Sequence, residues 1–140
     1  MDSEAKVTGI GGMFFKCDDP DAIKDWYRDH LGLKTNPYGS VFEFRSANNP
    51  EERNFLQWSI FPAGTDYFQP STKEFMINYR VKNLERLIDE LRASDVEIVG
   101  EIESFEYGKF AHILDPEGNK IELWEPVDSV FAEIGDETTH

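Results

Sequence analysis

The feature that most constrains the fold is a pattern of secondary-structure signals that occurs twice along the chain. Each half contains a strand, a helix with clear start and stop signals, and about three further strands that end in an apolar alternation and a proline. The first half spans residues 7–62 and the second spans 74–126, and Lys16 matches Arg80 at a shift of 64 residues. The repeat predicts an α+β fold in which two βαβββ modules form one curved, cup-shaped mixed sheet.

The helix signals are strong in both halves. Asp19 suits the N-cap position, Pro20 the first helical turn, and Gly32 the end of the first helix. Asn83 is the expected N-cap of the second helix. Apolar residues recur at helical spacing in both segments: Ile23, Trp26, Tyr27 and Leu31 in the first, and Leu84, Leu87, Ile88 and Leu91 in the second.

The last hairpin and the first strand carry the remaining local signals. Residues 107–126 contain two apolar runs around the turn sequence Asp-Pro-Glu-Gly-Asn, which predicts a β-hairpin. If Ile121 and Leu123 point to the core, Glu122 points to the opposite face of the sheet. In the first strand, the pair Gly11-Gly12 predicts a bulge or a close approach to the backbone.

Composition bounds the class of protein. The chain has 140 residues, a net charge of −14 and a single cysteine, so we expect one domain over residues 7–126 without internal disulfides. The negative charge argues against nucleic acid or an anionic membrane as a partner. No apolar run is long enough for a membrane span and the first residues do not resemble a signal peptide, which predicts a cytoplasmic location. Residues 127–140 form an acidic tail, in which helically spaced apolar residues predict either a short docked helix or a frayed end: Val127, Val130, Phe131 and Ile134.

Two segments resemble the vicinal-oxygen-chelate superfamily, which groups glyoxalase I, extradiol dioxygenases and bleomycin-resistance proteins. They are residues 19–33, with the sequence DPDAIKDWYRDHLGL, and residues 115–124, with the sequence DPEGNKIELW. The resemblance covers roughly residues 8–126. It implies paired βαβββ modules around a cup, and usually a homodimer with the cups near the interface.

The resemblance also implies where a metal would be bound. Carried over to this chain, the four ligand positions of metal-binding members look like Gly12, Gln57, Met76 and Glu122. Only Glu122 is a hard oxygen ligand, while a thioether is unsuited to the metals of such enzymes. We therefore expect no metal and no other cofactor. The alternative is a divalent metal held by Glu122, Gln57 and His112.

Two residues are candidates for chemistry at the cup. Glu122 is a candidate general base, and His112 would reach it if the register of the hairpin places both on one face. The alternative is a structural role, with each side chain hydrogen-bonded to a neighbour. Lys16 and Arg80, at equivalent positions of the two modules, would bind an anionic ligand or be solvated. The full set of predicted ligand-binding residues is Phe14, Lys16, Gln57, Met76, Asn78, Arg80, Tyr107 and Trp124.

Three functional hypotheses follow. The first is a metal-independent protein that binds a small organic molecule in an aromatic-lined cup, as a resistance or sequestering protein would. The second is a lyase or isomerase, similar to lactoylglutathione lyase, with Glu122 as general base. The third is an enzyme that retains a metal through Glu122.

Overall fold

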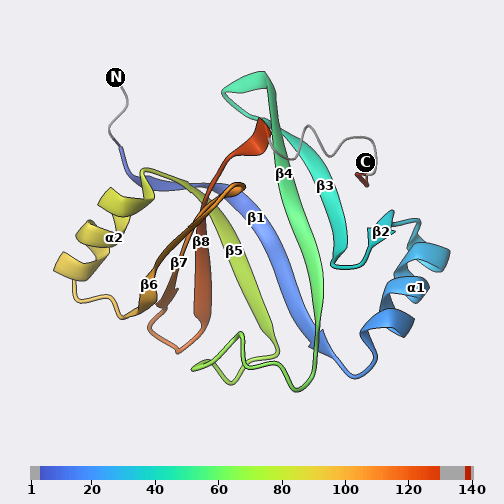
Figure 1. The fold of residues 1–140 in the computed structure, drawn as a ribbon. Helices are drawn as coiled ribbons and strands as arrows, with labels where there is room; N and C mark the ends of the chain where they lie inside the picture. Colours follow the sequence, from blue (N-terminus) through green and yellow to red (C-terminus); the bar gives the residue numbers. More distant parts are fainter. Residues whose placement is uncertain (1–3, 130–137, 140) are drawn as a thin grey trace.

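The computed structural model describes residues 4–129 and 138–139 of the chain. It contains one strongly curved eight-stranded sheet with two helices on its outer side (Figure 1). The α+β class predicted from the repeat is confirmed. In chain order the elements are β1 (Lys6–Cys17), α1 (Pro20–Leu31), β2 (Thr35–Asn36), β3 (Gly39–Ser46), β4 (Asn49–Pro62), β5 (Phe75–Lys82), α2 (Leu84–Ala93), β6 (Ile98–Phe105), β7 (Gly108–Leu114) and β8 (Lys120–Pro126).

The strand order reflects the two modules. It is β2-β3-β4-β1 for the first module and β5-β8-β7-β6 for the second, and the antiparallel pairing of β1 with β5 joins them within one chain. In each module the first and last strands are parallel neighbours, β1 with β4 and β5 with β8. The four central strands therefore bring the start and end of both modules to the middle of the sheet.

The glycine pair of β1 shows both alternatives that the sequence left open, a bulge and a close approach to the backbone. The register of β1 against β5 shifts between Ile10 and Gly12, which makes Gly11 a bulge residue. A Cβ atom on Gly11 would lie 2.3 Å from Oδ1 of Asn78 and 2.9 Å from Cγ of Arg80. The absence of a side chain at Gly11 thus lets two polar side chains of β5 cross the backbone of β1.

The two faces of the sheet differ in character. Both helices lie on one side, called here the helix face, and the opposite concave side is called the cup face (Figure 1). On the helix face, α2 packs its buried Leu84 and Ile88 onto residues of β5, β7 and β8 that include Leu123. Ile121 packs against the same core, so Glu122, between them, points to the cup face as predicted.

The helix ends follow the sequence signals with one correction. The side chain of Asp19 accepts a hydrogen bond from the backbone N–H of Ala22, and Gly32 takes the left-handed conformation at φ 76°. Asn83 is also left-handed, and its side chain does not cap α2. Instead the Glu125 carboxylate accepts the N–H of Leu84 at 2.8 Å, because β8 ends beside the start of that helix.

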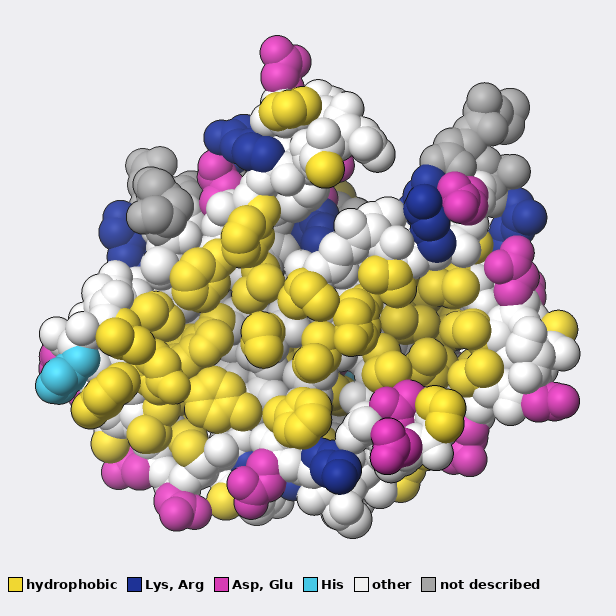
Figure 2. Space-filling view, turned by 180° about the vertical axis from the view of Figure 1, so that it is seen from behind, with side chains coloured by type: hydrophobic (Ala, Val, Ile, Leu, Met, Phe, Trp, Pro, Cys, Tyr) yellow, Lys and Arg dark blue, Asp and Glu magenta, His cyan; other side chains and the backbone are white. Residues whose placement is uncertain are grey.

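A broad apolar surface remains exposed on the helix face. Figure 2 shows it as a nearly continuous yellow area with charged side chains at its edges. None of the residues of α1 is fully buried, so this helix leaves much of its apolar side uncovered. We call this surface the apolar helix face, and its members are between 42% and 59% exposed: Val7, Ile10, Met13, Trp26, Leu31, Phe44 and Phe75.

The end of the chain returns to the first module. The N–H of Thr139 donates to the carbonyl of Val41 at 2.7 Å, and the Ser40 and Thr139 hydroxyls lie 2.7 Å apart. Of the predicted tail helix, residues 130–137 lie outside the described part of the chain. Within the described residues, no helix combines the length and apolar character needed to cross a membrane.

Candidate functional site

A buried carboxylate occupies the floor of the cup. Glu122 is only 2% exposed, and its Oε1 accepts a hydrogen bond from Nδ2 of Asn78 at 2.7 Å. Its Oε2 accepts from the Tyr67 hydroxyl and lies 2.8 Å from Nε2 of His112. Because an ionised carboxylate only accepts hydrogen bonds, the contact with His112 assigns a proton to Nε2. We call these four residues the Glu122 cluster.

Strand register explains why three of these residues meet. His112 of β7 is the antiparallel partner of Glu122 in β8, and Asn78 of β5 is its parallel partner on the other side. The residue beside Glu122 is therefore Asn78, and Met76, which the family resemblance suggested, lies two residues along the same strand. Met76 is fully buried against Phe14 and Phe68. A two-residue difference keeps the side chain on the cup face but removes it from the carboxylate.

The fourth member, Tyr67, comes from the segment between the two modules, where the sequence predicts no functional residue. Lys120 holds this segment in place, since its Nζ donates to the Tyr67 carbonyl at 2.7 Å. Burial, together with the negative charge of Glu122, raises the pKa of the Tyr67 hydroxyl. The phenol therefore stays protonated at neutral pH and can keep donating to the carboxylate.

Aromatic packing closes this end of the cup. The ring of Phe61 is stacked on Tyr67, with centroids 5.6 Å apart, and meets the edge of Phe68 at 5.1 Å. Phe68 is completely buried against Phe14 and Met76. The segment from residue 63 to 74, called here the plug loop, thus covers the Glu122 cluster with Tyr67 and anchors itself with Phe68.

Two amide atoms on the cup floor lack partners. Nε2 of Gln57 and Oδ1 of Asn78 are both buried, and neither has a hydrogen-bond partner among the described residues. Gln57 and Asn78 flank Gly12 from opposite sides, because β4 and β5 are the two neighbours of β1 at that position. An unpartnered buried donor and acceptor cost free energy unless another group satisfies them. They are therefore candidate positions for a polar group of a ligand or for water.

The residues of the cup floor do not fit the metal centre of the superfamily. Within residues 4–129 and 138–139, no group of three or more histidine, cysteine, aspartate or glutamate side chains is placed to hold a metal ion. At the Gly12 position, a Cβ atom would lie 2.8 Å from the ring of Phe14, which therefore occupies the space of a first ligand. Asn78 turns an amide N–H, not an oxygen, toward Glu122. Of the alternative ligand set, Gln57 offers at most an amide oxygen, and Glu122 and His112 are already paired with each other, so these residues do not match the donor set of that centre.

Arg80 lies at the other end of the cup and is held by several groups. Its Nη1 donates to the carbonyl of Phe55 at 2.8 Å, and its Nη2 donates to Oδ1 of Asn54 at 3.0 Å and to Asp128. The guanidinium also lies over the ring of Trp124, 5.3 Å from its centroid. With 7% exposure, Arg80 is a buried cation, not a solvated one.

Lys16 and Arg80 are not brought together. Lys16 pairs with Phe61 near the plug loop, and its Nζ lies 5.4 Å from the centroid of Phe68, whereas Arg80 pairs with Gly9 near the other end of β1. Since β1 and β5 are antiparallel, equivalent positions of the two modules lie at opposite ends of the shared pair. The two cations therefore cannot hold one small anion jointly.

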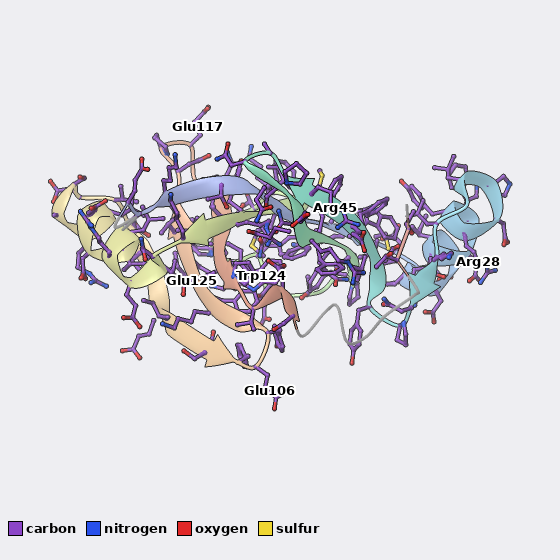
Figure 3. The ribbon with its side chains drawn as sticks, turned by 90° about the horizontal axis from the view of Figure 1, so that it is seen from above. Arg28, Arg45, Glu106, Glu117, Trp124 and Glu125 are labelled. Atoms are coloured by element: carbon purple, nitrogen blue, oxygen red, sulfur yellow. The ribbon has the colours of Figure 1, made fainter. Side chains whose placement is uncertain are left out.

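The remaining predicted aromatic residues form one wall of the cup. Trp124 is stacked on Phe110 with centroids 5.8 Å apart, and its indole N–H donates to the carbonyl of Tyr107 at 3.0 Å. Tyr107 in turn is stacked on Phe105, and both rings are partly exposed. Figure 3 shows Trp124 near the middle of the molecule, whereas Glu106 and Glu117 lie at its edges.

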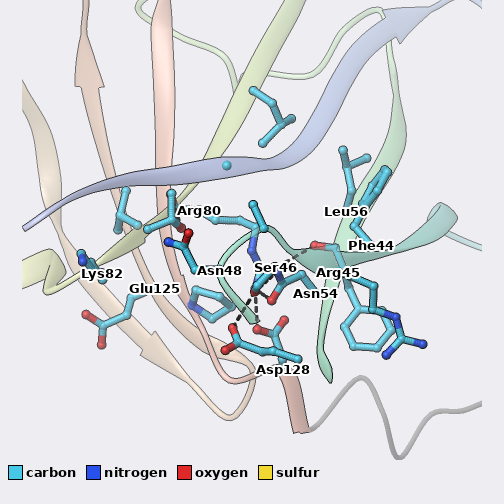
Figure 4. A pocket seen from close by; sticks show the side chains of 18 of the residues that line it. Phe44, Arg45, Ser46, Asn48, Asn54, Leu56, Arg80, Lys82, Glu125 and Asp128 are labelled. Carbon is cyan, nitrogen blue, oxygen red and sulfur yellow. Dashed lines mark hydrogen bonds and ion pairs between the residues drawn. The ribbon is translucent and has the colours of Figure 1, made fainter. Parts of the chain in front are cut away.

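A cleft opens where β1 and β4 diverge. These strands pair only from Gly12 and Gln57 onward, so the N-terminal half of β1 separates from the β3–β4 hairpin. The cleft has a volume of about 960 Å³, and its lining includes Arg80, Asn54 and Asp128 (Figure 4). No member of the Glu122 cluster lines it. The cleft is therefore distinct from the cup floor that the plug loop covers, and its lining joins Arg80 to side chains of the apolar helix face such as Ile10 and Met13.

The family follows from the sequence together with this fold. Residues 9–123 match the model of the Glyoxalase/Bleomycin resistance protein/Dioxygenase superfamily. This match covers most of the chain, so the protein belongs to that superfamily. No curated protein matches the sequence.

Solved structures share the architecture at low sequence identity. A methylmalonyl-CoA epimerase from Mycobacterium tuberculosis is 21% identical with a TM-score of 0.58, over 94% of this chain and 97% of that one. A Streptomyces coelicolor methylmalonyl-CoA epimerase is 14% identical with a TM-score of 0.64, and the match covers 87% of this chain and 99% of that chain. The Mn(II)-bound glyoxalase from Novosphingobium aromaticivorans is 13% identical with a TM-score of 0.57, and the match covers 98% of this chain and 42% of that chain. At these identities the likeness concerns the fold alone.

Proposed function

We propose that this chain binds a small organic molecule in its aromatic-lined cup without a divalent metal or other cofactor. The observation that carries the proposal is the polar floor, where the Glu122 cluster lies beside the unpartnered Gln57 Nε2 and Asn78 Oδ1. Small-molecule sites combine apolar walls with a few convergent polar groups in this way. Phe14, Phe61 and Trp124 supply the walls.

The plug loop sets the condition for binding. Tyr67 lies over Glu122 and donates to it, so a ligand that reaches the carboxylate must supply a donor in place of the phenol. A ligand that instead stops above Tyr67 meets the Phe105–Tyr107 aromatic pair. Both modes predict a ligand with an aromatic or apolar body, and the first mode also requires a hydrogen-bond donor.

Thermal unfolding with a panel of small aromatic and carbonyl compounds tests this proposal. We expect at least one compound to raise the melting temperature saturably at one molecule per chain, with no change on addition of EDTA. In Gln57→Leu, which replaces the unpartnered amide with an apolar group, the affinity for that compound is expected to fall about tenfold, the loss of roughly one hydrogen bond. The exposed Gln69→Leu is the matched control and should bind like the wild type. A transition metal that copurifies at one per chain and is lost with EDTA would contradict the proposal.

The hydrogen-bonded pair of His112 and Glu122 favours a second candidate, a lyase or isomerase in which Glu122 removes a proton next to a carbonyl group. Its Oε2 is 2.8 Å from the imidazole, which is close enough for the two groups to share a proton during turnover. Such an enzyme would exchange that carbon-bound hydrogen with D2O, and Glu122→Gln would abolish the exchange. A pure binding protein would show no exchange with any ligand that stabilises it.

We further propose that the chain forms a homodimer through the apolar helix face, and not with the cups near the interface as the family resemblance implies. Seven large apolar side chains that are about half exposed lie on this one face, more than a monomeric surface usually presents as one patch. Charged side chains at the edge of the patch would remain in solvent as an interface rim (Figure 2). The chain's strong negative charge makes a charged partner surface less suitable than a second apolar one.

A matched pair of phenylalanine variants tests the dimer. Phe75, on the apolar helix face, and Phe105, on the cup side of β6, are 47% and 48% exposed. By sedimentation velocity we expect a wild-type dimer, a predominantly monomeric Phe75→Asp, and a Phe105→Asp that stays dimeric. A monomeric wild type at micromolar concentration, or equal effects of both variants, would show that the face has another role.

A further inference from the structure

In the cleft at the Arg80 end of the sheet, the ion pair between Arg80 and Asp128 leaves one oxygen of the carboxylate unsatisfied. Arg80 pairs with Asp128 through a single oxygen, Oδ2. The other oxygen, Oδ1, is buried without a hydrogen-bond partner among the described residues. Guanidinium and carboxylate groups pair most strongly through two parallel hydrogen bonds. The Asp128 carboxylate, tethered to the end of β8, does not achieve that geometry.

The guanidinium itself is fixed from the other sides. The Phe55 carbonyl and the Asn54 amide oxygen accept from its two terminal nitrogens, and its Cζ lies 5.3 Å from the centroid of the Trp124 ring. Its aliphatic stem crosses β1 at Gly9 and Gly11, where a Cβ atom would lie 3.9 Å and 2.9 Å from it. A cation that is buried and held in this way is already oriented toward the cleft, so an incoming anion would spend little free energy on ordering it.

The walls of the cleft indicate what the rest of a ligand looks like. Apolar side chains form one side of it, from β1 and from the β3–β4 hairpin: Ile10, Met13, Phe44 and Leu56. A ligand with a carboxylate that pairs with Arg80 and an apolar chain that packs along these residues would match both the cation and the apolar wall of the cleft. The cleft has a volume of about 960 Å³, which is more than enough for a ligand with a short alkyl chain.

We propose that this cleft is a second binding site, for an amphipathic carboxylate whose head group replaces Asp128 on Arg80. Asp128 then acts as an internal competitor that occupies the cation while no ligand is bound. The site is separate from the polar floor of the proposed function, because no residue of the Glu122 cluster lines the cleft. Ile10, Met13 and Phe44 also belong to the apolar helix face, so a second copy of the chain would lie beside the ligand's apolar end.

Calorimetric titration with octanoate tests this site, and octanamide serves as the uncharged ligand of equal length. We expect Asp128→Ala to bind octanoate at least tenfold more tightly than the wild type, about 1.4 kcal/mol, and to gain no affinity for octanamide. Glu52→Ala removes a different carboxylate from the same cleft and should leave both affinities unchanged. The oligomeric state is measured at the same protein concentration.

Several outcomes would overturn the proposal. They are octanoate binding that is equal in the wild type and Asp128→Ala, an equal gain for octanamide, and no octanoate binding in either protein. Should Asp128→Ala fail to fold, Asp128→Asn removes the competing charge but keeps the size of the side chain. This variant must then bind octanoate at least tenfold more tightly than the wild type. Glu122→Gln is expected to bind octanoate like the wild type, so failure at the cup floor and failure at the cleft can be distinguished.

Discussion

Glu122→Ala is expected to lower the free energy of unfolding by about 3–5 kcal/mol, because three buried hydrogen-bond donors lose their common acceptor at a cost of about 1–3 kcal/mol each. The substitution leaves the Asn78 amide, the His112 imidazole and the Tyr67 hydroxyl facing each other without their common acceptor. Each buried donor that loses its acceptor adds a desolvation penalty. Urea unfolding followed by tryptophan fluorescence gives the difference from the wild type.

An exposed glutamate in the same sheet provides the control. Glu101 in β6 is exposed, so Glu101→Ala should change the stability by less than about 0.5 kcal/mol. Glu122→Gln keeps the volume of the side chain and one acceptor oxygen, so its loss of stability is expected to lie between those of Glu122→Ala and Glu101→Ala. If Glu122→Ala were as stable as Glu101→Ala, the cluster would not be the structural centre of the cup floor, and water would have to satisfy its donors.

The sequence predicts much of the fold because the relevant signals are local. Asp19 and Gly32 mark the ends of α1 within one residue, and the alternation around Glu122 identifies the face that meets the helices. The Gly11-Gly12 pair alone predicts an irregularity in β1, which the structure shows as a shift in the register of β1 against β5. Because the same order of strands and a helix occurs twice along the chain, few topologies remain possible.

The candidate site was less predictable because it depends on register between distant strands. A shift of two residues keeps every side chain on the same face, so the alternation in β5 does not distinguish Met76 from Asn78 as the neighbour of Glu122. His112 meets Glu122 because the β7–β8 turn fixes their register. The capping role of Glu125 at α2 likewise depends on where β8 ends, which no local motif records.

Tyr67 is the member of the Glu122 cluster that the sequence does not predict. It lies in a segment rich in turn-forming residues and carries no family motif. The available signal was the pair Tyr67-Phe68, two large aromatic residues in a segment otherwise suited to solvent. A loop that buries a phenylalanine completely is anchored to the core, and loops of this kind position functional groups.

The anchor of the plug loop should carry much of the stability of this end of the cup. Phe68→Ala is expected to lower the free energy of unfolding by about 3 kcal/mol, since a fully buried phenylalanine is replaced by a cavity. The same change removes the ring that packs on Phe14 and Met76 and so weakens the placement of Tyr67 over Glu122. Urea unfolding measures the first effect, and hydrogen exchange of the backbone amides of Gln69 and Ser71 measures the second.

Phe105→Ala is the matched control, because Phe105 is 48% exposed and Phe68 is not exposed at all. We expect the control to lose less than about 1 kcal/mol and to leave the exchange rates of the loop unchanged. If the loop opens before the rest of the protein in Phe68→Ala, its amides will exchange faster while those of β8 stay protected. Equal protection of loop and β8 amides in Phe68→Ala and wild type would mean that Tyr67 and Lys120 hold the loop without the phenylalanine, and that access to Glu122 is controlled at those two residues instead.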